Sequence, residues 1–234
     1  MVWQPLSDTR PHGETLSQPH GLPSPLLAVI RRSPLQLHPN DGLVLVYGHP
    51  AVLRLGLYAA ADRVLAGEPI LYLDGANAFD PFVITRLARA SGVAPRTLLL
   101  SIHVSRAFTC HQMASLITER LEPAFRAHRA RIAILSGPLE TFYDEAVPHD
   151  EVARLAHTML TFLRHVARCG FRLLCLCPPA PVQTQGRRIL LQSLWAQADR
   201  VIGVGEADDA LVLREEAPGS SKRWAIPRAV WEST

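Results

Sequence analysis

A repeating alternation of short apolar runs and longer amphipathic segments constrains the fold of this chain more than any other feature. Each run is rich in Val, Ile and Leu, as in "LVLVY" (43–47), and each is followed by a segment with apolar residues at helical spacing. Continuously apolar strands are typical of parallel sheets that helices cover on both faces. The pattern therefore predicts an α/β fold with a mainly parallel central sheet and helices on both faces.

The alternation also gives the order of the elements. The predicted strands are 42–48, 69–75, 96–104, 131–137, 171–179 and 200–206. The predicted helices are 51–66, 81–92, 111–129, 149–170 and 189–198. Two further apolar runs, 210–216 and 222–228, are separated by the turn-forming sequence "APGSS", which predicts an antiparallel β-hairpin at the end of the chain.

The first 42 residues of the chain lack this alternation. Residues 1–25 contain five prolines and no periodic pattern, which predicts a flexible Pro-rich tail. "LLAVI" (26–30) is interpreted as a short strand or an anchor within a connector that spans 26–42. The expected domain organisation is this tail, this connector, and one core domain over 43–234.

Composition favours a cytoplasmic protein with a large core. The chain has 234 residues, of which 48% are hydrophobic, enough to bury a sizeable core. No apolar run is long enough to span a bilayer, and we expect no secretory signal and no membrane partner. Four cysteines in a chain of this length do not indicate a disulfide framework, which agrees with a reducing compartment.

The turn between the first strand and the first helix has the frame of a phosphate-binding loop without its chemistry. Such a loop has the pattern GxxxxGK[ST], in which backbone N–H groups hold phosphates and the hydroxyl holds Mg²⁺. Counting from Gly48, Leu53 occupies the glycine position, Arg54 the lysine position and Leu55 the hydroxyl position. Pro50 removes one further backbone donor. Taken alone, this stretch is also compatible with an ordinary turn in any α/β fold.

Four later segments resemble RecA/RadA-type recombinases of the archaeal and eukaryotic branch. They are "YLDGANAFDPFVITRLARASGV" (72–93), "SRAFTCHQMASLI" (105–117), "RIAILSGPLETFY" (131–143) and "TFLRHVARCGFRLLCLCPPAP" (161–181). Their order and spacing agree with the family over about residues 40–228, and the "RAF…HQ" segment is the most specific. The resemblance implies a three-layer RecA-like core.

The resemblance also implies that the nucleotide site is degenerate. The family's catalytic glutamate falls on Ala76, its Walker B aspartate on Ser136, and its phosphate-sensing glutamine near Pro178 or Pro179. Phosphoryl transfer depends on positioning and on charge neutralisation by a metal and cations. With the changes at 53–55, no matched position retains that chemistry, so we expect no catalytic residues and no cofactor. Binding of ATP and Mg²⁺ is expected only if the chain is a divergent ATPase.

Two loops correspond to the DNA-binding loops of the family. The first, 142–150, is short and acidic, which is unfavourable for phosphate contacts. The second, "PVQTQGRR" (181–188), contains four candidate DNA-binding residues, Gln183, Gln185, Arg187 and Arg188. A solvated polar loop before a helix is the alternative interpretation.

The spacing of the cysteines is only weak evidence for a metal site. Cys175 and Cys177 are two apart on a predicted strand and therefore face the same side. A zinc site is the alternative, but buried free cysteines are commonly core residues, so no metal is expected.

Three functional hypotheses follow. The first is a non-catalytic RecA-fold accessory, a pseudo-ATPase in DNA recombination or repair, that binds a RecA-family protein or itself, with single-stranded DNA as a further partner. The second is a divergent ATPase of the same superfamily. The third is a regulatory or inhibitory protein that uses the fold for partner binding. All three predict a cytoplasmic protein, with association with the nucleoid under the first.

Overall fold

The computed structural model describes residues 4–5, 25–181, 187–216 and 222–232, and its strands form one nine-stranded sheet. The strand order is β1-β4-β3-β5-β6-β2-β7-β8-β9. The strands are β1 (Gln4–Pro5), β2 (Leu43–Tyr47), β3 (Ile70–Asp74), β4 (Ile102–Arg106), β5 (Ile132–Ser136), β6 (Arg172–Cys177), β7 (Arg200–Ala207), β8 (Ala210–Glu215) and β9 (Arg223–Pro227).

Six neighbouring strands, from β4 to β7 in the sheet order, are parallel. Antiparallel strands flank them, with β1 against β4 at one edge and the β7-β8-β9 meander at the other. The predicted mainly parallel sheet and the predicted C-terminal hairpin are therefore confirmed. Although β3 follows β2 in the chain, β5 and β6 lie between them, so β2 is an interior strand.

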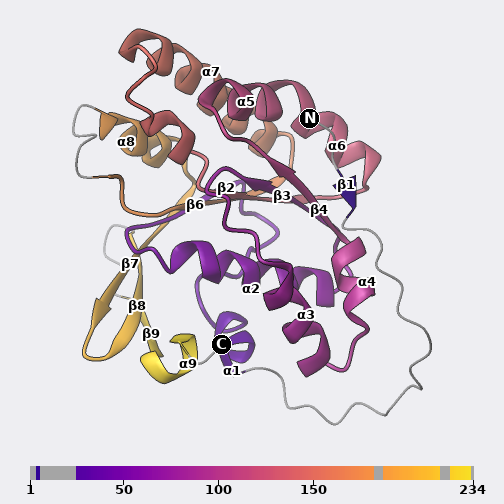
Figure 1. Cartoon of the computed structure of the whole chain (residues 1–234). Helices are drawn as coiled ribbons and strands as arrows, with labels where there is room; N and C mark the ends of the chain where they lie inside the picture. The colour runs from indigo at the N-terminus through magenta and orange to yellow at the C-terminus, as the bar shows by residue number, and fades with distance from the viewer. Residues whose placement is uncertain (1–3, 6–24, 182–186, 217–221, 233–234) are drawn as a thin grey trace.

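Helices lie on both faces of the sheet (Figure 1). They are α1 (Pro25–Ile30), α2 (Val52–Leu65), α3 (Pro81–Ala90), α4 (Pro95–Leu100), α5 (Cys110–Ser115), α6 (Leu121–Ala127), α7 (His149–Arg168), α8 (Ile189–Gln197) and α9 (Arg228–Glu232). A π-helical turn (Leu116–Arg120) joins α5 to α6, and a 3₁₀ turn (Glu140–Tyr143) follows β5. The face with α2 and α3 also carries α1, α4 and α9, and α5 to α8 lie on the other.

Strand alternation divides the hydrophobic core into two halves. In β2, Val44 and Val46 pack with α2 and α3, whereas Leu43 and Leu45 pack with the helices of the opposite face. Successive side chains of a strand point to opposite faces, so a strand between two helical layers needs apolar residues at every position. Cys175 and Cys177 share one side of β6, as their spacing predicts, and both are buried in the core.

Two predicted elements differ from the structure. The segment 26–30, interpreted as a strand or an anchor, forms most of α1, which packs against α2. The strand predicted over 96–104 begins only at Ile102, because residues 95–100 form α4. Pro95 at the start of α4 fixes a backbone angle that suits a first helical turn, while the apolar "TLLL" run indicated a strand.

A buried carboxylate fixes the connector to α2. Asp62 accepts hydrogen bonds from Arg31 at 2.6 Å, from Gln36 at 2.9 Å and from Arg63 at 2.7 Å. Burial alone raises the pKa of Asp62, but the hydrogen bonds from Arg63, Arg31 and Gln36 outweigh it and lower the pKa. The connector is therefore held by charge as well as by the apolar contacts of α1. Over the described residues, no helix is both long and apolar enough to cross a membrane.

Candidate functional site

The predicted nucleotide-site residues lie where parallel strands end. Strands β2, β3, β5 and β6 are parallel neighbours in the sheet, so their carboxyl ends share one edge. Ligands of open α/β sheets bind in crevices at this edge. The residues at 48–55, at 76 and at 136 follow or end three of these strands and therefore lie at this edge.

The turn after β2 begins at a position that only glycine fits. Gly48 has a φ of +108°, and a Cβ added there would lie 2.8 Å from the carbonyl oxygen of Val204 on β7. The backbone therefore passes directly against the neighbouring strand. This contact fixes the path of the turn before any ligand is considered.

Four N–H groups of this turn are already hydrogen-bonded within the protein. Gly48 N donates to the carbonyl of Cys177 at 3.2 Å, and Ala51 N donates to His49 Nδ1 at 3.1 Å. The N–H groups of Val52 and Leu53 donate to the carbonyls of His49 and Pro50, and Pro50 has no N–H to offer. A phosphate cradle needs several converging free N–H groups, and this turn does not supply them.

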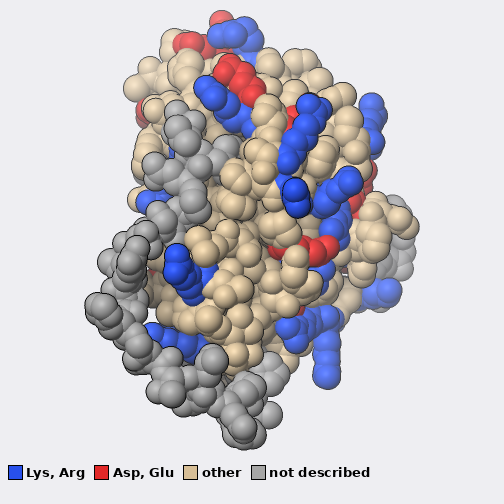
Figure 2. All heavy atoms as spheres, turned by 90° about the vertical axis from the view of Figure 1, so that its right-hand side faces the viewer, with Lys and Arg blue, Asp and Glu red and all other residues tan. Residues whose placement is uncertain are grey.

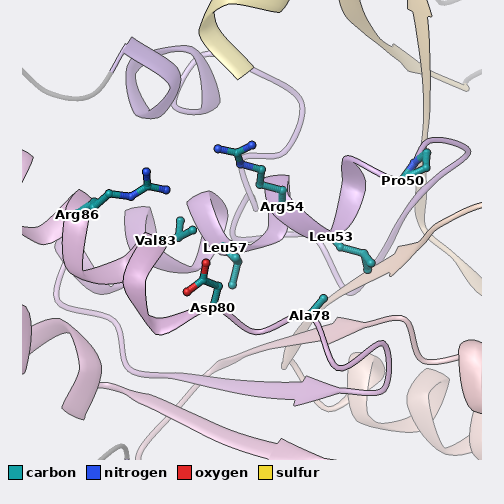
Figure 3. A pocket seen from close by; sticks show the side chains of 8 residues that line it. All are labelled: Pro50, Leu53, Arg54, Leu57, Ala78, Asp80, Val83 and Arg86. Carbon is teal, nitrogen blue, oxygen red and sulfur yellow. The ribbon is translucent and has the colours of Figure 1, made fainter. Parts of the chain in front are cut away.

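The three residues at the motif positions point to different environments. Helix α2 begins at Val52, so all three already belong to the helix. Leu55 is 2% exposed within the core, and Leu53 packs against the same cluster from a half-buried position. Arg54 instead lines a surface pocket between α2 and α3 (Figure 3). The position of the phosphate-binding lysine therefore holds a cation that extends away from the sheet edge.

The position that the resemblance assigns to a catalytic glutamate, Ala76, is closed by backbone packing. Ala76 N and Gly75 N both donate to the carbonyl of Ser136, at 3.1 and 2.8 Å. A Cβ added at Gly137, whose φ is +60°, would lie 2.6 Å from the Ala76 Cβ. The loops after β3 and β5 are thus in direct contact, and Ala76 is part of that contact.

At the end of β5, Ser136 is completely buried. Neither its hydroxyl nor the buried Tyr72 hydroxyl has a hydrogen-bond partner of good geometry among the described residues. A neutral side chain occupies the position that the resemblance assigns to a metal-coordinating carboxylate. The described residues contain no group of three or more His, Cys, Asp or Glu side chains placed to hold a metal ion.

Two carboxylates at this edge were missed by the sequence reasoning, and Asp74 is the first. It is buried at the end of β3 and accepts from the N–H groups of Ala78 and Phe79 at 2.9 and 3.0 Å. The guanidinium of Arg106 donates to it at 3.2 Å. Asp74 therefore organises the loop between β3 and α3. A carboxylate directly after the apolar run "ILYL" is the signal that could have identified it.

Glu140, in the 3₁₀ turn after β5, is the second. Its Cγ packs over Gly137 on the side where Ala76 also packs, 2.7 Å from a Cβ added at that glycine. No hydrogen bond or ion pair joins its carboxyl group to another described residue. Burial raises the pKa of Glu140 to about 7. A carboxyl group with a pKa near 7 thus lies close to Ala76, the position that the resemblance assigns to a catalytic glutamate.

The candidate DNA-binding residues are only partly described. Gln183 and Gln185 lie outside the described residues. Arg187 is 8% exposed and donates to the carbonyls of Phe142, Asp144 and Val147 at 2.6, 2.5 and 2.7 Å. Its guanidinium is committed to the loop after β5. Arg188 is exposed and remains accessible to a phosphate.

Comparison with known proteins adds no family to this description. No protein-family model matches the chain, and no curated protein is similar to it in sequence.

Proposed function

We propose that the chain is a non-catalytic protein with a RecA-like core that acts as an accessory in DNA recombination or repair, by binding a catalytic relative or a second copy of itself. The closed turn after β2 carries the proposal, because Ala51, Val52 and Leu53 use their N–H groups inside the turn. A protein whose strand edge has no phosphate-binding loop can still act by binding partners through its surfaces.

One stretch of the chain, residues 81–118, supports the binding role. Residues 81–118 contain four arginines and no acidic residue. The same segment carries three exposed apolar side chains, Phe82 at 76%, Phe108 at 65% and Leu100 at 40%. Figure 2 shows one side of the molecule, on which blue basic side chains predominate over red acidic ones. Exposed aromatic residues among arginines, with lysine absent, are typical of protein interfaces.

The contact to DNA is the weaker part of the proposal. It now depends on Arg188 and on the undescribed residues at 183 and 185, because the Arg187 guanidinium binds three backbone carbonyls. One arginine contributes little to a phosphate-backbone interaction. DNA binding that falls steeply with salt and weakens in Arg188→Ala would support this contact.

The proposal is tested with the purified chain and the catalytic RecA-type recombinase of the same organism. We expect a stoichiometric complex in size-exclusion chromatography with light scattering, or concentration-dependent self-association. The double change Phe82→Ser and Phe108→Ser should weaken it at least tenfold. Ile189→Ser is the matched control, since Ile189 is 59% exposed but lies on α8. A monomer that binds no recombinase, or a tight complex only with a protein outside recombination, would contradict the proposal.

Glu140 favours one second candidate, a divergent ATPase. A general base works best with a pKa near the operating pH, and burial places the pKa of Glu140 at about 7. This candidate predicts measurable Mg·ATP turnover that falls at least a hundredfold in Glu140→Gln. Turnover that is absent, or unchanged by that substitution, would leave the accessory role as the better account.

A further inference from the structure

A pocket opens on the surface between α2 and α3. Its volume is about 430 Å³, within the range of small-molecule sites. Its lining residues come from the start of α2, from the loop before α3 and from α3: Pro50, Leu53, Arg54, Leu57, Ala78, Asp80, Val83 and Arg86. In Figure 3 the Arg54 and Arg86 guanidinium groups extend from the two helices, with Leu57 and Val83 between them in this view.

We infer that this pocket binds a carboxylate joined to an apolar body, with Arg54 as the residue that pairs the carboxylate. Arg54 is half-buried and makes no hydrogen bond or ion pair to any other described residue. By contrast, Arg63 on the same helix pairs with Asp62 and Glu68. A guanidinium fork binds a carboxylate through two parallel hydrogen bonds, and partial burial strengthens that attraction.

Asp80 limits the charge of the ligand. Its carboxylate also lines the pocket, where its Oδ1 accepts the Phe82 N–H at 2.8 Å and caps α3. A triphosphate would bring several negative charges beside this fixed carboxylate without a metal to neutralise them. A single carboxylate is compatible with Asp80 because Arg54 balances it. Arg86 makes contacts of its own, so the inference rests on Arg54.

The remaining walls select the rest of the ligand. Leu57, Val83 and Leu53 give the pocket an apolar lining, on which an aliphatic or aromatic body gains free energy by leaving water. The carboxylate has two potential sources, a free organic acid or an acidic side chain beside an apolar one on another protein. This inference is independent of the proposed accessory role, because a metabolite would bind whether or not the chain contacts a recombinase.

The test uses the full chain labelled with ¹⁵N-arginine and follows the Arg54 Nε–H resonance by NMR. The probes are octanoate for a free acid, acetyl-Leu-Glu-amide for a protein side chain, and octanol as the neutral control. We expect saturable shifts with at least one anionic probe at millimolar concentration and none with octanol. The anionic probe with the lower Kd identifies the source. Equal responses to octanoate and octanol would overturn the inference.

Variants separate the site from the rest of the surface. Arg54→Gln should weaken binding of the anionic probe at least tenfold, followed through backbone amides of α3, with an unchanged Tm. Arg89→Gln is the matched control, because Arg89 is an exposed arginine of α3 that does not line the pocket. Binding that survives in Arg54→Gln, or metal-free ATP that binds more tightly than octanoate, would contradict the assignment.

Discussion

The turn after β2 and the loop after β5 satisfy their backbone polar groups in opposite ways. In the turn after β2, the N–H groups of Ala51, Val52 and Leu53 donate to residues two or three positions earlier in the chain. The Gly48 N–H donates to the carbonyl of Cys177, at the end of the neighbouring strand β6. The side chain of Arg54 has no described partner. In the loop after β5, three carbonyls depend on a single remote guanidinium, that of Arg187. Both arginines occupied predicted functional positions, yet only Arg54 is free to meet a ligand. The position of a residue in a motif does not determine whether its charge is available.

Loss of the Arg187 side chain should lower the free energy of unfolding more than any other change to these two loops. Arg187→Ala leaves three partly buried carbonyls without their charged donor. Hydrogen bonds to charged groups contribute about 1.5–3 kcal/mol each, and they are not additive, so we expect a loss of about 3 kcal/mol in urea unfolding. Arg188→Ala, at an exposed neighbour, should change the free energy of unfolding by less than about 0.5 kcal/mol. Equal losses in the two variants would mean that the three hydrogen bonds of Arg187 contribute nothing to the free energy of unfolding.

Gly48 tests how firmly the turn after β2 is fixed. Gly48→Ala adds strain at positive φ and places a Cβ 2.8 Å from a backbone oxygen, so we expect a loss of about 2–3 kcal/mol. Gly67→Ala is the control, because Gly67 also has a positive φ of +83° but open space around it. Its cost should be about 1 kcal/mol, from conformation alone. If the two variants unfold at the same urea concentration, the contact with β7 does not hold the turn.

Glu140 gives the loop after β5 a pH dependence. Its pKa is raised by burial from 4.5 to about 7, so the folded state keeps a proton that the unfolded state releases. Between pH 4.5 and 7 its contribution to stability therefore falls as pH rises. Glu140→Gln should remove this slope in urea titrations across that window. A variant with the wild-type pH profile would show that the carboxyl group is solvated.

His103 should contribute a slope of the opposite sign. Burial and the stacked ring of His128, at 3.7 Å between centroids, lower the pKa of His103 from 6.5 to about 4. The unfolded chain binds the proton first, so stability is lost as pH falls from 6.5 towards 4. His103→Gln should flatten the acid side of the profile. If acid sensitivity is unchanged, another group is responsible for it.

The regular part of the fold could be predicted from sequence because the signal is local. The strands at 43–47, 132–136 and 172–177 need apolar residues on both faces, so each can be recognised in the sequence as a nearly continuous apolar run. The same rule wrongly predicted a strand at the "TLLL" run of α4, because three leucines suit a helix as well as a strand. Strand order could not be obtained this way, since it depends on contacts between distant segments.

The candidate site could be traced from the sequence only where its residues are contiguous. Counting from Gly48 follows one strand, turn and helix, which the structure describes as β2, the turn and the start of α2. The roles of Arg187 and Asp74 depend on loops that only the fold brings together. Glu140 carried no signal in the sequence, since its raised pKa comes from burial.

Titration of the full chain with Mg·ATP tests the central claim most directly. The account predicts no saturable heat of binding up to millimolar nucleotide, and no change in hydrogen exchange at the Ala51, Val52 and Leu53 amides, because these donors are already bonded in the turn. Micromolar binding that protects those amides and disappears in Arg54→Ala would contradict it.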